Sequence, residues 1–144
     1  MKTIKKIAGS NKLHPFFLVF LWVAIVIYAI TFFRTFNSNV YPAIKIVNSV
    51  YCTLMIIGLC LMTQAKKIGY YLCIGLWIIL GIGMSIFYFT NGHHSILFRG
   101  TILTPMQSAF ATIAGVVIWI FLLKVFMQIK KDGKDAYEIM FGNE

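Results

Sequence analysis

The sequence lacks acidic residues until Asp132, which is the first of only four acidic side chains in the chain. Long uncharged runs occupy most of the chain before it, separated by small groups of lysine and arginine. The absence excludes paired carboxylates for acid–base hydrolysis there. It also excludes the carboxylate at mid-membrane depth that ion pumps, proton relays and multidrug exporters use. We therefore expect neither a coupled transporter nor an enzyme, and no catalytic residue.

Motifs for cofactors are absent as well. The chain has no glycine-rich phosphate loop with its lysine. Its three cysteines, Cys52, Cys60 and Cys73, form no C-x-x-C pair and fall inside apolar runs, where they fit small packing residues better than redox groups or a disulfide framework. His14 lies at the start of an apolar run, not within one, which disfavours a haem held between helices. We expect no cofactor.

Apolar residues make up 60% of the chain, charged residues only 12%, and the mean hydropathy is +0.84. A soluble domain of this size cannot bury so much apolar surface, whereas a bilayer acts as its solvent. A spanning helix needs about 20 apolar residues, and four such runs fit the chain. The sequence predicts an all-α integral membrane four-helix bundle, a single transmembrane domain over 1–144. Its spans are expected at about 16–33, 46–63, 68–89 and 105–127, with a tail at 128–144.

The first run, 16–33, is too long for the apolar region of a secretion signal, which has about 7–15 residues, so we expect a retained span. His14-Pro15 and Thr104-Pro105 are typical helix starts, because proline suits the first helical position. In the tail, Tyr137, Met140 and Phe141 share one side of a possible short helix that would lie on the membrane surface. A solvated, frayed tail is the favoured alternative.

Ten of the thirteen lysines and arginines fall on one side of this arrangement, and only Arg34, Lys45 and Arg99 fall on the other. The positive-inside rule then predicts both termini in the cytoplasm and a multi-pass protein of the cell inner (plasma) membrane. The net charge of +9 does not favour nucleic acid, because the basic residues flank apolar runs. The lipid bilayer is the expected partner. The main orientation signals are Lys2, Lys5, Lys6, Lys66, Lys67, Lys130 and Lys131.

Small and weakly polar residues recur at helical spacing in the fourth span: Ser108, Ala111, Thr112 and Gly115. Such a stripe lets helices approach closely, so packing within one bundle is the first interpretation. A subunit interface or a pore lining remains open. Three polar residues of the second span, Asn48, Ser49 and Thr53, are expected to form a matching patch. We predict hydrogen bonds from this patch to the fourth span.

His93 and His94 are the weak metal candidates of the chain, since imidazole binds metals well. Adjacent side chains point apart on a strand and about 100° apart on a helix. No carboxylate or cysteine lies nearby to complete a coordination shell. A solvated polar loop is favoured over a metal site.

The segment Lys130-Lys131-Asp132-Gly133-Lys134-Asp135-Ala136-Tyr137 follows directly on the fourth span. It resembles the ending of uncharacterised small four-span bacterial membrane proteins, which finish in K-N/D-G-K-x-A and an aromatic residue. The His-Pro entry to the first span and the lysine-bearing link before Gly69-Tyr70-Tyr71 are similar to theirs. The resemblance implies the four-span layout and no activity, ligand or catalytic residue.

These patterns favour a non-enzymatic structural or accessory membrane protein that acts by helix–helix association, with itself or with another membrane protein. Two alternatives stay open. One is a small pore-forming or membrane-permeabilising protein, such as a holin-like or defence effector. The other is a component of an uncoupled small transporter.

Overall fold

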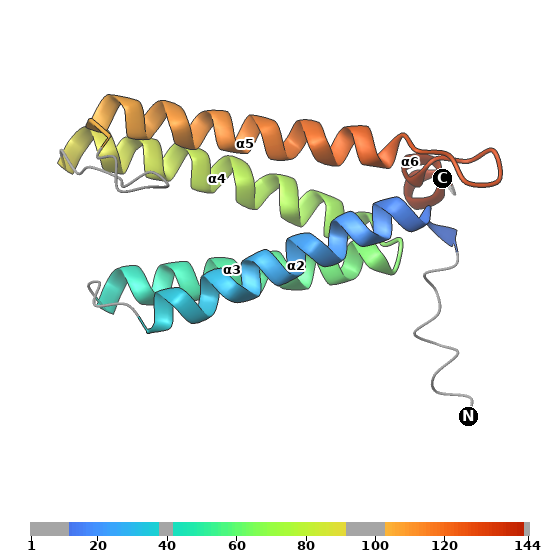
Figure 1. Ribbon diagram of the computed structural model, residues 1–144, viewed down its shortest axis with the longest axis horizontal. Helices are drawn as coiled ribbons and strands as arrows, with labels where there is room; N and C mark the ends of the chain where they lie inside the picture. Colours follow the sequence, from blue (N-terminus) through green and yellow to red (C-terminus); the bar gives the residue numbers. More distant parts are fainter. Residues whose placement is uncertain (1–11, 38–41, 92–102, 143–144) are drawn as a thin grey trace. The chain divides into compact units, whose positions relative to one another are not determined.

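The computed structural model describes residues 12–37, 42–91 and 103–142, and in these residues all the regular secondary structure is helical apart from one isolated β-bridge (Figure 1). Four of the helices are long and apolar enough to cross a membrane, as judged by length and composition. The prediction of an all-α chain with four long apolar helices is confirmed. The helices are α2 (Pro15–Phe36), α3 (Pro42–Thr63), α4 (Lys67–Asn91), α5 (Pro105–Met127) and the short α6 (Ala136–Phe141).

The long helices begin where the sequence indicates. The ring of His14 accepts a hydrogen bond from the backbone N–H of Phe16, and Pro15 occupies the first helical position of α2. Thr104 and Gln107 form reciprocal side-chain to backbone hydrogen bonds of 3.0 and 3.3 Å at the start of α5, a capping box. Both proline starts expected from the sequence are confirmed.

Three helices extend past the predicted spans. The first two predicted spans were 16–33 and 46–63, whereas α2 ends at Phe36 and α3 begins at Pro42. The predicted spans cover only the apolar runs. A helix can continue into polar residues beyond such a run, so the observed helices are longer. α2 stops at Asn37, whose N–H bonds back to the carbonyl of Phe33. Lys45 then donates to the carbonyl of Phe36 at 3.2 Å and satisfies an exposed acceptor at this helix end.

The contacts divide the chain into two compact units, so a single domain over 1–144 stays a prediction. The first unit holds α2, α3, the start of α4, the end of α5 and the tail. α2 and α3 lie side by side in it (Figure 1). The ring of Phe20 in α2 stacks on Phe126 in α5, with centroids 4.6 Å apart. Its buried apolar core includes Leu13, Phe17, Leu21, Ala24, Cys52, Met55, Leu59, Met62, Cys73, Met127, Ala136 and Met140.

α3 and α4 approach closely at a pair of glycines in the first unit. A Cβ atom at Gly69 would lie 2.5 Å from the carbonyl oxygen of Gly58 and 2.7 Å from the backbone nitrogen of Met62. A Cβ atom at Gly58 would lie 2.8 Å from the sulfur of Cys73. Gly69 therefore requires glycine, because a Cβ atom there would meet the backbone of α3, whereas at Gly58 the sulfur of Cys73 would have to shift.

The turn between α3 and α4 is a Schellman motif, in which the N–H of Lys66 bonds to the carbonyl of Leu61 and the N–H of Ala65 to that of Met62. The motif places Ala65 in the left-handed region, with φ at 57°. Glycine usually occupies this position, because a Cβ atom is disfavoured there.

We expect the substitution Ala65→Gly to stabilise the protein by about 1 kcal/mol, because it removes the cost of a left-handed alanine. The measurement is the free energy of unfolding in micelles, from titration with a denaturing detergent. The control Ala111→Gly lies in the interior of α5, where the same change is expected to lower stability. Equal destabilisation by both substitutions would contradict the role given to the turn.

The second unit, 74–123, pairs the remainder of α4 with most of α5. The rings of Trp77 and Trp119 stack with centroids 6.0 Å apart. A Cβ atom at Gly81 would lie 3.0 Å from a methyl group of Val116, so glycine allows a close approach here as well. The buried Ser85 hydroxyl donates to the carbonyl of Gly81 at 2.6 Å and lies 3.5 Å from that of Ala109.

The tail folds into two small elements. Asp132 and Gly133 have φ values of 53° and 81°, and Lys131 and Lys134 exchange two backbone hydrogen bonds around them. This is a two-residue β-turn of type I′, for which Asp-Gly is a favoured sequence. Asp135 and Glu138 then form a capping box at the start of α6.

α6 packs against the first turns of α4. The ring of Phe141 lies 5.6 Å from those of both Tyr70 and Tyr71, and Ala136 and Met140 are buried. The favoured expectation of a frayed, solvated tail is therefore wrong for residues up to 142. The amphipathic stripe was recognised in the sequence, but its packing partner, about 70 residues earlier in the chain, was not.

Candidate functional site

The small-residue stripe of α5 divides between two environments. Ser108 is buried, whereas Ala111 is exposed. Thr112 donates its hydroxyl to the carbonyl of Ser108 at 2.9 Å. Gly115 has no heavy atom within 4 Å of the position that a Cβ atom would take. The stripe therefore flanks the α4 contact made by Ala109, Val116 and Trp119 and leaves Ala111 and Gly115 uncovered within the second unit.

The polar patch of α3 is engaged within the first unit. The amide of Asn48 donates to the hydroxyl of Thr35 in α2, and the hydroxyl of Thr53 donates to the carbonyl of Ser49 at 2.8 Å. The predicted bonds from this patch to α5 stay a prediction. The partner of Asn48 was not predicted from the sequence, because Thr35 lies beyond the predicted first span of 16–33.

We expect Asn48→Ala to destabilise the protein by about 0.6–1.7 kcal/mol, between the mean and the maximum measured for hydrogen bonds between membrane helices. Unfolding in detergent micelles measures the effect. The matched control is Thr53→Ala, which removes a bond inside a single helix and is expected to change stability less. A double-mutant cycle with Thr35→Ala assigns the loss to the pair. A coupling energy near zero in that cycle would contradict the proposed bond.

A second polar contact joins α2 and α3 nearer the middle of both helices. The hydroxyls of Tyr28 and Tyr51 share a hydrogen bond of 3.4 Å, and their rings meet edge to face with centroids 5.9 Å apart. The shared bond satisfies both hydroxyls, because a hydroxyl without a hydrogen bond is costly in an apolar environment. This pair was not predicted from the sequence. The signal was a tyrosine near the centre of each of two neighbouring spans.

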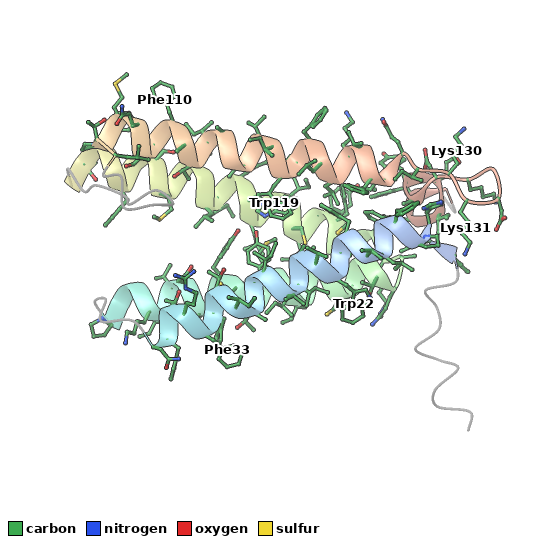
Figure 2. The ribbon with its side chains drawn as sticks, in the orientation of Figure 1. Trp22, Phe33, Phe110, Trp119, Lys130 and Lys131 are labelled. Atoms are coloured by element: carbon green, nitrogen blue, oxygen red, sulfur yellow. The ribbon has the colours of Figure 1, made fainter. Side chains whose placement is uncertain are left out.

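Lysines and aromatic rings gather at one end of the first unit. Lys66 and Lys67 precede Tyr70 and Tyr71 at the start of α4, and α6 packs on these two tyrosines. Lys130 and Lys131 follow the end of α5 next to α6 (Figure 2). We call this region the lysine–tyrosine end; its described members are Lys12, Lys66, Lys67, Tyr70, Tyr71, Lys124, Lys130, Lys131, Lys134, Tyr137 and Phe141. The other orientation signals, Lys2, Lys5 and Lys6, lie outside the described residues.

The part of the chain that the structure describes contains no group of three metal-ligating side chains. The weak metal candidates His93 and His94 lie outside it. Cys52 and Cys73 are buried and Cys60 is half-buried, and all three are free thiols. Cys73 packs where α3 and α4 cross, next to Gly58. The placement of Cys52 and Cys73 agrees with their interpretation as packing residues.

A shallow groove of about 390 Å³ lies where α2 ends and α3 begins. It is almost wholly apolar, and its polar members are Lys45 and Ser49. Lys45 is already bonded to the carbonyl of Phe36. An open apolar groove on the outside of two apolar helices fits lipid chains better than a polar substrate. Its lining is Phe36, Pro42, Lys45, Ile46, Ser49 and Val50.

Comparison with known proteins found no matching family model, no matching curated protein and no matching solved structure. The assignment of function therefore rests on the physical chemistry of the helices and of the contacts described above.

Proposed function

We propose that the chain is a non-enzymatic, multi-pass protein of the cell inner membrane that acts by helix–helix association in lipid. Its four long helices form a bundle, with both termini in the cytoplasm. Its partner is a second copy of the chain or another membrane protein. The observation that carries the proposal is the uncovered small-residue flank of α5, Ala111 and Gly115, next to the surface that already packs on α4.

The outward faces of the long helices support a lipid surrounding. Trp22 and Phe33 project from α2, and Phe110 projects from the side of α5 away from α4 (Figure 2). Phe33 is 64% exposed and Phe110 59% exposed. Soluble monomers rarely expose contiguous apolar surface on this scale, whereas hydrocarbon solvates it at no cost.

The orientation rests on charge. The lysine–tyrosine end carries most of the described lysines, and Arg34 and Lys45 lie at the opposite ends of α2 and α3. The positive-inside rule places the lysine–tyrosine end in the cytoplasm. The test is alkaline phosphatase, which is active only outside the cytoplasm, fused after residue 37 or after residue 128. The fusion at 37 is expected to be active and the fusion at 128 inactive, and the reverse pattern overturns the orientation.

Association through α5 requires small residues, because they let a second backbone approach closely. We expect Ala111→Phe to raise the dissociation constant of the dimer or complex at least tenfold, since overpacking an interface costs about 1–3 kcal/mol. The measurement is energy transfer between labelled copies in liposomes, or co-purification with the partner. A single oligomeric state unaffected by the substitution would overturn the role of this flank.

The matched control is Val117→Phe. Val117 is 59% exposed and lies on the far side of α5 from the stripe, two residues from Gly115 and one to two turns from Ala111. The same bulky residue there faces lipid and is expected to leave association unchanged. Equal loss in both variants would indicate general damage to α5 and not a specific interface.

The hydrogen bonds of the serine and threonine hydroxyls favour helix packing over a water-filled pore. Thr53 and Thr112 bond to carbonyls of their own helices, and Ser85 does the same. These groups are satisfied without water. Induced expression is therefore expected to leave the membrane potential unchanged, and depolarisation of the cells would favour the pore-forming alternative.

A further inference from the structure

The lysine–tyrosine end has a large excess of positive charge. Seven of its described members are lysines, and only Asp132, Asp135 and Glu138 oppose them among the described residues. All the lysines except Lys131 are exposed. Clusters of four to eight basic residues next to a spanning helix attract anionic lipid headgroups.

Two of the three acidic side chains accept hydrogen bonds from backbone N–H groups. Asp135 accepts from the N–H of Glu138 at 2.7 Å, and Glu138 accepts from the N–H of Asp135 at 3.1 Å. Their carboxylates are held at the start of α6 by this capping box. They keep their charge, but seven lysines against three carboxylates leave a net positive field at this end.

The tail is held at the level of the first turns of α4. Phe141 packs on Tyr70 and Tyr71, and Tyr137 stacks on Phe141 with ring centroids 4.5 Å apart. Tyr71 and Tyr137 remain 62% and 54% exposed. Exposed tyrosine rings settle at the headgroup level of a bilayer. The contact with α6 therefore fixes the lysines after α5 close to the lipid phosphates.

The start of α4 offers both a charge and an apolar surface. Lys67, Ile68 and Tyr71 share one face of its first turn, and Ile68 is 62% exposed. A lipid presents a phosphate next to acyl chains, which matches this arrangement. A soluble phosphate would use only the charge.

We propose that the lysine–tyrosine end is a binding surface for anionic phospholipid headgroups. The lysines beside α4 and after α5 attract the phosphate, the exposed tyrosines lie between headgroups, and Ile68 contacts the acyl chain. The docked α6 holds these parts together. The inference rests on the proposed insertion in a membrane and goes beyond association through α5.

The test uses the full chain, extracted from membranes in a neutral detergent, and follows thermal unfolding while lipid is added. Phosphatidylglycerol is expected to raise the unfolding midpoint saturably, whereas phosphatidylcholine and inorganic phosphate are not. The gain is expected to shrink as salt rises from about 0.05 to 0.5 M, because salt screens exposed charges. Equal effects of the anionic and the zwitterionic lipid would overturn the proposal, and an equal effect of phosphate would point to an ion site instead.

The variant Lys66→Gln/Lys67→Gln/Lys130→Gln is expected to weaken the apparent affinity for phosphatidylglycerol on the order of a hundredfold, roughly fivefold per lysine. The same three positions changed to arginine keep the charge and are expected to keep the affinity. Lys45→Gln, at the other end of the helices, is the control and is expected to change nothing in the titration. Unaltered affinity in the triple glutamine variant would overturn the proposal.

The outcomes separate this inference from the proposed function. Protein that needs detergent for extraction but shows no preference for anionic lipid contradicts the headgroup surface alone. Protein that is recovered without detergent contradicts membrane insertion before any lipid is added.

Discussion

Replacing Val26 by arginine is expected to destabilise the folded protein in a bilayer by about 2.5–3.5 kcal/mol. Val26 lies near the middle of α2, and its side chain is 53% exposed. In water, an exposed position of this kind tolerates arginine within about 0.5 kcal/mol. In hydrocarbon, the guanidinium must be desolvated or must draw water into the membrane. The size of the effect therefore reports which solvent surrounds α2.

The measurement is reversible unfolding in liposomes, compared with the same change at Phe33. Phe33 belongs to the same helix and is 64% exposed, but it lies next to Arg34 near the end of α2. Phe33→Arg is expected to cost much less, because a long basic side chain near a helix end reaches the interface. Equal and small costs at both positions would contradict a lipid surrounding for α2.

The second large effect is expected from Gly69→Ala. The added Cβ atom would lie within 3 Å of three atoms of α3, one from each of Gly58, Leu61 and Met62, and two of these atoms are backbone. Backbone atoms cannot rotate away, so the crossing of α3 and α4 must open. We expect a loss of about 2–3 kcal/mol, in the range of overpacked cores.

The control for this prediction is Gly83→Ala in the same helix. Gly83 is exposed, and no heavy atom lies within 4 Å of the position of its Cβ atom. Alanine there is expected to leave stability unchanged or to raise it slightly, because alanine has the higher helix propensity. Titration of both variants with a denaturing detergent gives the comparison. A harmless Gly69→Ala would show that the close crossing is not a requirement of the fold.

The two units use the same physical principle at different places. In lipid the hydrophobic effect does not drive helices together, so helix association depends on van der Waals packing and hydrogen bonds. In the first unit the glycine crossing and the Asn48–Thr35 and Tyr28–Tyr51 bonds supply these contacts. In the second unit the close approach at Gly81 and the Trp77–Trp119 stack supply them. The uncovered flank at Ala111 and Gly115 has the same character, which is why we assign it to a partner helix.

Much of the fold was predictable because an apolar run in the sequence marks the body of each long helix. The starts of α2 and α5 carry a local signal as well, His14-Pro15 and Thr104-Pro105. The turn at Asp132-Gly133 was predictable for the same reason, since it depends on adjacent residues. The helix ends were less predictable, as the extension of α2 to Phe36 shows, because polar residues do not by themselves stop a helix.

Contacts between distant residues were not predictable in this way. The third span carries several glycines, but nothing in the sequence separates Gly69, which meets α3, from Gly83, which has no neighbour within 4 Å of the position of a Cβ atom. The docking of Phe141 on Tyr70 and Tyr71 likewise depends on tertiary packing over a long sequence separation. A short amphipathic helix at a chain end looks the same whether it packs, lies on lipid or frays.

The most direct test of a lipid surrounding is the recovery of the protein from a cell lysate with and without detergent. We predict that the chain stays in the membrane pellet through an alkaline carbonate wash and leaves it only in detergent. Recovery as a monodisperse species in the detergent-free supernatant would show that water surrounds α2 to α5 and would contradict the account.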